Sequence, residues 1–153
     1  MRSDIVMENR LYTIENSTVD DCKMVELKRS SNEACDYICV ENGVEIPFDV
    51  KRVYYLYDIP EGESRGAHAH KELYQLIIAL NGSFDVVLDD GCNKRRFTLS
   101  SPNEALLVVP GIWRDLENFS SKSVCLVLAS MIYSEEDYIR EYEQFLVFKE
   151  EQL

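Results

Sequence analysis

Short apolar runs separated by turn residues extend over much of the chain after residue 30. The run at residues 52–57, Arg-Val-Tyr-Tyr-Leu-Tyr, is rich in the β-branched and aromatic residues that strands favour. Asn81-Gly82 and Pro110-Gly111 are turn dipeptides between such runs. A spacing of about 8–12 residues between runs is typical of an all-β sandwich or barrel. The predicted strands are residues 37–41, 52–57, 73–80, 84–88, 96–99, 105–109 and 124–129.

The C-terminal part of the chain has a different period. Ser134 precedes three acidic residues, as a helix N-cap often does. Apolar residues then recur at helical spacing, at Tyr138, Ile139, Tyr142, Phe145 and Leu146. We therefore predict one amphipathic helix over residues 135–149 that packs on the barrel through its aromatic stripe.

Length and composition limit the classes of function. A chain of 153 residues predicts a single domain over residues 1–153, and a net charge of −12 argues against a nucleic-acid partner. No run approaches the roughly 20 apolar residues of a membrane span. The first ten residues include Asp4 and Glu8 and lack the apolar core of a secretory signal, so we expect a cytoplasmic protein. The five cysteines form no C-x-x-C pair, and we expect reduced thiols.

Both histidines of the chain lie in one short segment, residues 65–71, Arg-Gly-Ala-His-Ala-His-Lys. On a strand, residues two apart point to the same face, so His68 and His70 are predicted to present two imidazoles side by side. Two such rings can share a metal, or they can transfer protons near neutral pH. A third interpretation is a pair of histidines without function, although Arg65 and Lys71 make the segment too polar for ordinary core.

The surroundings of the histidines follow the first cupin motif, with Gln75 where that motif normally has Glu. The second motif is expected to bring a further His near a Pro-Gly turn, and Arg114 stands in its place. Metal sites of this kind need imidazoles and an anionic oxygen, whereas a guanidinium repels a divalent cation. We therefore predict a cupin double-stranded β-helix, or jelly roll, with a C-terminal α-helix and with no metal and no cofactor.

Several runs together resemble the dTDP-4-keto-6-deoxyglucose 3,4-ketoisomerases, the WxcM-like cupins, over roughly residues 34–147. The runs are residues 46–55 (Ile-Pro-Phe-Asp-Val-Lys-Arg-Val-Tyr-Tyr), the histidine segment, Pro110 with Trp113, and residues 137–140 (Asp-Tyr-Ile-Arg). The resemblance implies a metal-free homodimer with exchanged N-terminal strands that acts on a dTDP-linked keto sugar. It also implies a role in making 3-amino sugars for surface polysaccharide or glycoprotein.

The resemblance assigns proton transfer to His68 and His70. It associates Arg114 with a gluco-configured 3-keto product. The family position near residue 34 carries Arg or Tyr, whereas this chain has Ala34, so the configuration of the product at C4 stays open.

Moving a ketone from C4 to C3 requires removal of the C3 proton, an enediol, and return of a proton to C4. Imidazoles suit both transfers, and a cation stabilises the developing enolate oxygen. We favour His70 as the C3 base with His68 assisting, although the sequence does not decide between them. The predicted substrate-binding residues are Tyr55, Arg65, Lys71, Gln75 and Arg114.

Strand parity places Tyr55 and Tyr57 on one face with Val53, and Tyr54 on the other. Trp113 and Phe84 are either core residues or stacking partners for the nucleotide base.

Three other functions remain open at this point. A cupin 3,5-epimerase normally pairs its His with a carboxylate and a Tyr, and no carboxylate accompanies His68 and His70 in the sequence. A metal-dependent oxygenase or hydrolase would need a bound metal. A non-catalytic sugar-nucleotide-binding cupin would show no turnover.

Overall fold

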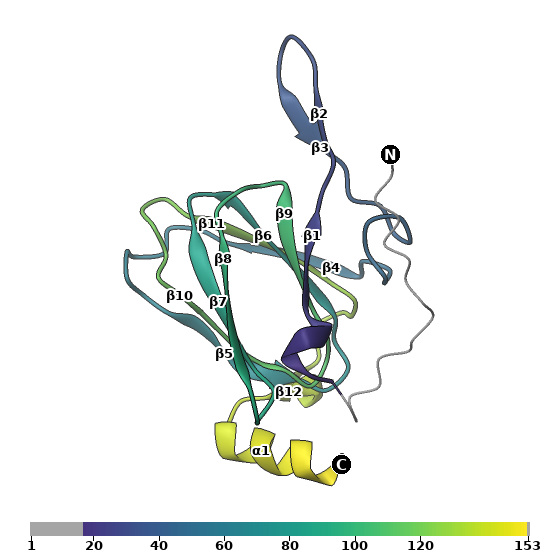
Figure 1. The fold of residues 1–153 in the computed structure, drawn as a ribbon, viewed down its shortest axis with the longest axis vertical. Coiled ribbons are helices and arrows are strands. Elements are labelled where there is room, and N and C mark those ends of the chain that lie inside the picture. The colour runs from purple at the N-terminus through teal and green to yellow at the C-terminus, as the bar shows by residue number, and fades with distance from the viewer. Residues whose placement is uncertain (1–16, 153) are drawn as a thin grey trace.

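The computed structural model describes residues 17–152 of the chain, and its architecture is a two-sheet antiparallel barrel (Figure 1). The first sheet has the strand order β1-β9-β6-β11-β4 and the second β12-β5-β10-β7-β8. This confirms the predicted all-β jelly roll. The first sheet consists of β1 (Lys23–Glu26), β4 (Arg52–Leu56), β6 (Gln75–Asn81), β9 (Glu104–Val108) and β11 (Val124–Ala129). The second consists of β5 (Arg65–His70), β7 (Phe84–Asp89), β8 (Lys94–Leu99), β10 (Trp113–Glu117) and β12 (Tyr138–Ile139).

The main core lies between the two sheets, where alternate side chains of each strand point inward. Ile77, Val86, Leu106 and Val127 are almost fully buried there. A second cluster covers the outer face of the first sheet, where residues of the 38–50 segment pack against β6 and β9. Burial on both faces explains why β6 is an unbroken apolar run rather than an alternating one.

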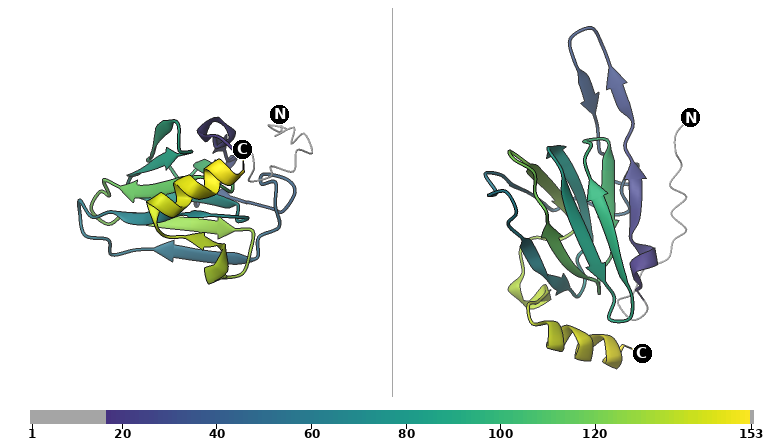
Figure 2. Two further views of the ribbon diagram at one scale, coloured as in Figure 1. Left: turned by 90° about the horizontal axis from the view of Figure 1, so that it is seen from below. Right: turned by 60° about the vertical axis from the view of Figure 1, so that its left-hand side comes forward.

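A two-stranded hairpin of β2 (Arg29–Ser31) and β3 (Asp36–Ile38) projects from the barrel on the side away from the C-terminal helix (Figures 1 and 2). Before it, a short 3₁₀ helix, η2 (Val19–Asp21), and β1 belong to the barrel, with Val19 and Val25 buried. The weakly patterned start of the chain therefore contributes core residues from residue 19 onward.

The prediction of one helix over residues 135–149 is wrong. The structure has a 3₁₀ helix, η3 (Glu135–Asp137), then β12, and then α1 (Tyr142–Glu151). Ser134 makes no side-chain cap, and Tyr138 and Ile139 pair with His70 and Ala69 of β5. Pairing with a strand edge gave these residues hydrogen bonds that helical propensity did not predict.

The shorter helix α1 packs on the barrel through a small apolar cluster, as the aromatic stripe predicted. Phe145 is fully buried and joins Ala69, Trp113 and Ile139. Trp113 is thus a packing residue, and Phe84 is buried against Phe119 at a ring distance of 5.1 Å.

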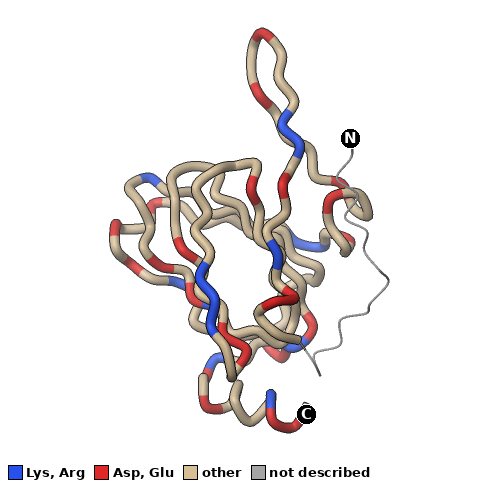
Figure 3. Tube along the Cα trace, viewed as in Figure 1, with Lys and Arg blue, Asp and Glu red and all other residues tan. Residues whose placement is uncertain are grey.

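Acidic residues are spread around the chain trace, whereas Lys94, Arg95 and Arg96 form a consecutive basic run on β8 (Figure 3). Each of these three cations has an acidic partner, at Asp89, Asp20 and Asp85 respectively. The run is therefore locally neutralised and does not form the open basic surface that a nucleic acid needs. Within the described residues, no helix has the length and apolar character of a membrane span.

Candidate active site

The two histidines converge near the end of β5, as strand parity predicted. Their Nε2 atoms lie 3.0 Å apart, and the rings are nearly perpendicular, at 88°. His70 is completely buried, whereas His68 is only partly buried, and its Nδ1 contacts the Gly66 carbonyl. The pair therefore has one inner and one outer member.

A carboxylate completes the inner side of the pair. His70 Nδ1 lies 2.9 Å from Asp137 Oδ2, and Asp137 Oδ1 accepts a hydrogen bond of 2.7 Å from the Glu72 backbone N–H. The expectation that no carboxylate accompanies the histidines is wrong, because Asp137 lies 67 residues further along the chain. The Lys71 backbone N–H donates to the Asp137 carbonyl at 2.9 Å, which places β12 beside β5.

Tyr138, the residue after Asp137, forms a wall beside both imidazoles. Its ring centroid lies 4.4 Å from that of His70 and 5.0 Å from that of His68. The Arg140 guanidinium lies 4.2 Å from the same ring centroid and forms a two-point ion pair with Glu135. Asp137 and Tyr138 belong to the run that carried the family resemblance, which was the only sequence signal for them.

A second network of polar side chains contacts the histidines from the barrel interior. Arg114 on β10 is paired in register with His68 and is 1% exposed. Its guanidinium donates to Gln75 Oε1 at 2.6 Å and to the Ile112 carbonyl at 2.8 Å. Because Arg114 only donates, Gln75 presents its oxygen there and donates its amide N–H to the Tyr54 hydroxyl at 2.9 Å.

Of the predicted substrate-binding residues, the structure thus brings Gln75 and Arg114 together with the histidines, and it does not bring Tyr55. Tyr55 is 60% exposed on the outer face of β4 with Val53, as parity predicted, and Tyr57, directly after the strand, is exposed as well. Tyr54, on the inner face of the same strand, is the tyrosine that joins the network. Parity alone could not say which face of β4 turns inward.

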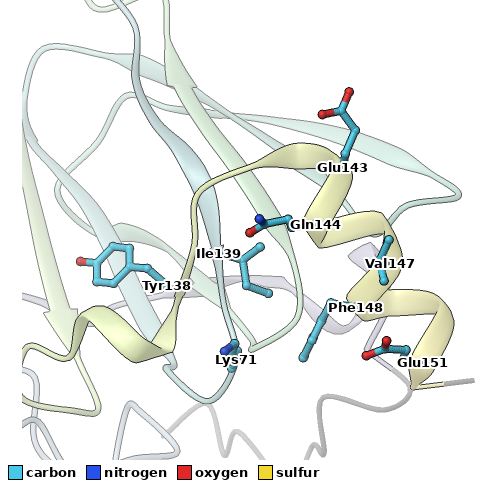
Figure 4. A pocket seen from close by; sticks show the side chains of 8 residues that line it. All are labelled: Lys71, Tyr138, Ile139, Glu143, Gln144, Val147, Phe148 and Glu151. Carbon is cyan, nitrogen blue, oxygen red and sulfur yellow. The ribbon is translucent and has the colours of Figure 1, made fainter.

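Arg65 and Lys71 also lie apart from this network. Arg65 is exposed at the start of β5, and its guanidinium donates to the Ser64 carbonyl at 3.3 Å. Lys71 lines a cavity of about 410 Å³ between the β5–β12 edge and α1, on which Tyr138 also borders (Figure 4). The lining residues are Lys71, Tyr138, Ile139, Glu143, Gln144, Val147, Phe148 and Glu151.

The surroundings keep both imidazoles neutral at neutral pH. Burial and the positive charge of Arg114 lower the pKa of His68 to about 3. Burial also lowers the pKa of His70, to about 4, although its hydrogen bond to Asp137 opposes the shift. Burial lowers the pKa of Arg114 to about 10, which still leaves it charged at pH 7. The site therefore combines two neutral bases with a fixed cation.

The donor set does not resemble a metal site. In the part of the chain that the structure describes, no three His, Cys, Asp or Glu side chains are grouped so that they could hold a metal ion. The residue opposite His68 is the cation Arg114, whose Nε has no hydrogen-bond partner among the described residues. An unpaired buried N–H is suited to an anionic or carbonyl oxygen rather than to a cation.

Comparison with known proteins gives consistent matches. The family described as "FdtA: WxcM-like, C-terminal" matches residues 20–150. A TDP-4-oxo-6-deoxy-α-D-glucose-3,4-oxoisomerase from Aneurinibacillus thermoaerophilus is 44% identical over 123 residues, which cover 80% of this chain and 88% of that protein.

Two solved structures share the fold closely. A 3,4-ketoisomerase from Helicobacter canadensis is 42% identical with a TM-score of 0.83, over 85% of this chain and 98% of that one. A mutant 3,4-ketoisomerase from Thermoanaerobacterium thermosaccharolyticum, in complex with TDP-4-keto-6-deoxyglucose, is 33% identical with a TM-score of 0.82. That match covers 85% of this chain and 94% of the other.

Proposed function

Because this chain belongs to the WxcM-like family of sugar 3,4-ketoisomerases, we propose that it converts a dTDP-4-keto-6-deoxyhexose to its 3-keto isomer. The observation that carries the mechanism is the pair of neutral imidazoles, His68 and His70, held 3.0 Å apart beside the buried cation Arg114. The enzyme is an isomerase, since oxidation at C3 is balanced by reduction at C4 within one molecule.

The reaction follows from the acidity of the C3 proton, which lies next to the C4 ketone. A neutral imidazole takes this proton while the C4 oxygen gains negative charge. Arg114 stabilises that charge, and Tyr54, whose oxygen already accepts from Gln75, keeps its own proton available to donate. The resulting enediol loses its C3 hydroxyl proton and gains a proton at C4, which leaves the ketone at C3.

The reaction as written requires no redox cofactor and no metal ion, and we propose none. Arg114 supplies the positive charge that a Lewis acid would otherwise provide near the enolate oxygen. Treatment with a chelator is expected to leave turnover unchanged. Loss of activity that added zinc, iron or manganese restores would contradict this.

The proposed substrate is tested directly by NMR. The protein is incubated with dTDP-4-keto-6-deoxyglucose in deuterated water, and the sugar signals are followed. We expect the ketone to move to C3 and solvent deuterium to enter at C4. Binding of the sugar nucleotide without any turnover would instead support a non-catalytic sugar-nucleotide-binding protein.

The Asp137–His70 contact also favours a second candidate, a 3,5-epimerase, because that chemistry pairs a His with a carboxylate and a Tyr. The same NMR experiment separates the two. An epimerase keeps the ketone at C4 and exchanges the protons at C3 and C5, whereas the ketoisomerase leaves C5 unlabelled.

We also propose a homodimer in which the N-terminal strands are exchanged. The support is the projecting β2–β3 hairpin and the edge strand β4, where Val53 and Tyr55 are exposed and which exposed Tyr57 follows directly. Ala34 lies in the turn of that hairpin, which projects from the barrel, and its N–H donates to Asn32 Oδ1 at 2.8 Å. Light scattering is expected to give about twice the chain mass of 17.7 kDa. The cytoplasmic location and the role in surface-sugar synthesis stay predictions.

A further inference from the structure

We propose that residues 10–14, which precede the described part of the chain, bind in the cavity between α1 and the β5–β12 edge. The occupant is this chain's own N-terminal segment rather than a second copy or another protein. The inference concerns a surface outside the histidine pair, and it does not depend on the proposed reaction.

The cavity is mostly apolar and has two acidic lining residues. Its apolar side chains include Ile139 of β12 and Val147 and Phe148 of α1 (Figure 4). Val147 is 53% exposed, so an apolar part of the lining faces solvent. Glu143 and Glu151 of α1 line the same cavity, and both are exposed. A segment that fits this cavity should therefore combine apolar side chains with a positive charge.

The described chain begins beside the same helix. The Nζ of Lys149 donates to the Ser17 carbonyl at 2.8 Å and lies 3.2 Å from the Ser17 hydroxyl. The backbone N–H of Val19 donates to Asp90 at 3.0 Å, which holds the next residues against the β7–β8 turn. The segment before Ser17 therefore starts at α1 of its own chain.

The distance from this point to the cavity is within reach of the segment. Lys149 and Val147 are two residues apart on α1 and so point to different sides of the helix, whose diameter is about 10–12 Å with side chains. Residues 10–14 lie three to seven positions before Ser17. An extended chain of that length spans roughly 10–23 Å, which is enough to pass around the helix.

The sequence of the segment complements the lining of the cavity. Residues 10–14 are Arg-Leu-Tyr-Thr-Ile. Leu11, Tyr12 and Ile14 supply apolar side chains, and Arg10 supplies a positive charge. The helix α1 contains three glutamates and one lysine, and that lysine is bound to Ser17. Arg10 would therefore meet a negative field at the cavity.

The choice of this occupant rests on where the family domain begins. The family match covers residues 20–150, so it includes α1 and leaves residues 10–14 outside. A segment tethered next to its site has a high effective concentration there, whereas a second copy would need a further interface. Tyr138 borders the cavity and also contacts both imidazole rings, so the bound segment would support this wall of the histidine site.

The placement is tested by photo-cross-linking in the full chain. Val147 is replaced by a diazirine amino acid of similar size, and the cross-linked peptides are identified by mass spectrometry after irradiation. The sample is a mixture of ¹⁴N- and ¹⁵N-labelled protein in which native mass spectrometry shows that any dimers have exchanged. We expect cross-links from position 147 to residues 10–14 that carry a single isotope.

Position 92 is the matched control for this probe. Cys92 is exposed in the β7–β8 turn, close to Asp90 and hence to the point where the segment starts, but it does not line the cavity. We expect its yield of cross-links to residues 10–14 to be lower by about fivefold or more. Equal yields from the two positions, or no cross-link from position 147 to residues 10–14, would overturn the proposal. Cross-links that join the two isotopes would make a second copy the occupant and would overturn it too.

The chemistry of the contact is tested by substitutions in the segment. Leu11→Asp removes an apolar side chain and adds a negative charge, so the cross-link yield from position 147 should fall by about tenfold and the melting temperature by about 2–4 °C. Ser3→Asp adds the same charge outside residues 10–14 and should change neither quantity. Arg10→Glu should also lower the yield, and 1 M salt should recover part of it because salt screens the repulsion. An unchanged yield and melting temperature in Leu11→Asp would contradict binding of this segment in the cavity.

Discussion

Two networks of polar side chains meet beside β5, and each contains one charged residue of opposite sign. The acidic network connects Asp137, His70 and His68, and the Glu72 backbone N–H in the β5–β6 turn donates to Asp137. The basic network connects Arg114, Gln75 and Tyr54 inside the barrel. Asp137 raises the pKa of His70, whereas Arg114 lowers the pKa of both imidazoles. The difference indicates two separate roles: the histidines of the acidic network transfer protons, and Arg114 of the basic network stabilises developing negative charge.

The largest expected effect comes from the histidines themselves. His68→Asn should lower kcat by about 10²- to 10⁴-fold, because one of the two imidazoles that we propose to transfer protons is lost. His70→Asn should lower it by a similar factor for the same reason. Steady-state kinetics measures both effects, and the melting temperature at pH 7 should change little. Near-full activity in both variants would place the chemistry elsewhere.

The variant Arg114→Gln tests the role of the basic network. The amide can still donate to Gln75, but the fixed charge is lost, so we expect kcat to fall by about 10- to 100-fold. Arg114 lowers the pKa of both imidazoles, so its removal should move the acid limb to higher pH. Asp137→Asn should move the acid limb to lower pH instead, because it removes a carboxylate that raises the pKa of His70. If the acid limb of the pH–rate profile moved in the same direction in both variants, the two networks would not act separately on the imidazoles.

Stability should depend on pH because the imidazoles are buried in neutral form. Their pKa values are about 3 and 4 in the folded protein, below the ordinary value of 6.5, so the unfolded chain binds more protons between about pH 6.5 and pH 4. The free energy of unfolding should therefore fall as the pH falls through this window. Thermal unfolding at a series of pH values measures it, and His70→Asn should show a shallower dependence. Equal slopes in the two proteins would contradict neutral burial of His70.

The smallest expected effect separates the two faces of β4. Tyr54→Phe removes the hydroxyl that accepts from Gln75, and we expect kcat to fall by about tenfold. Tyr55→Phe is the matched control, since this side chain is 60% exposed on the other face, and its kcat should stay within about twofold of the wild type. Kinetics on the two single variants makes the comparison. A larger loss for Tyr55→Phe would restore the original choice of Tyr55.

Much of this architecture was available from local patterns. Alternating and apolar runs separated by Asn-Gly and Pro-Gly turns predicted the barrel strands, because strand formation and turn conformation depend on neighbouring residues. Parity likewise placed His68 and His70 on one face, since side chains two apart on a strand always share it. The replacement of metal ligands by Gln75 and Arg114 was also visible in the sequence alone.

Only the tertiary structure decided which side chains complete the site. Asp137 lies 67 residues from His70, and its position depends on the pairing of β12 with β5, which overrode a helical pattern at Tyr138 and Ile139. The inward face of β4, and hence Tyr54 rather than Tyr55, depends on how the two sheets pack. Local periodicity specifies relative faces within one strand. Which face is buried, and what it meets there, is set by contacts between segments that are distant in the sequence.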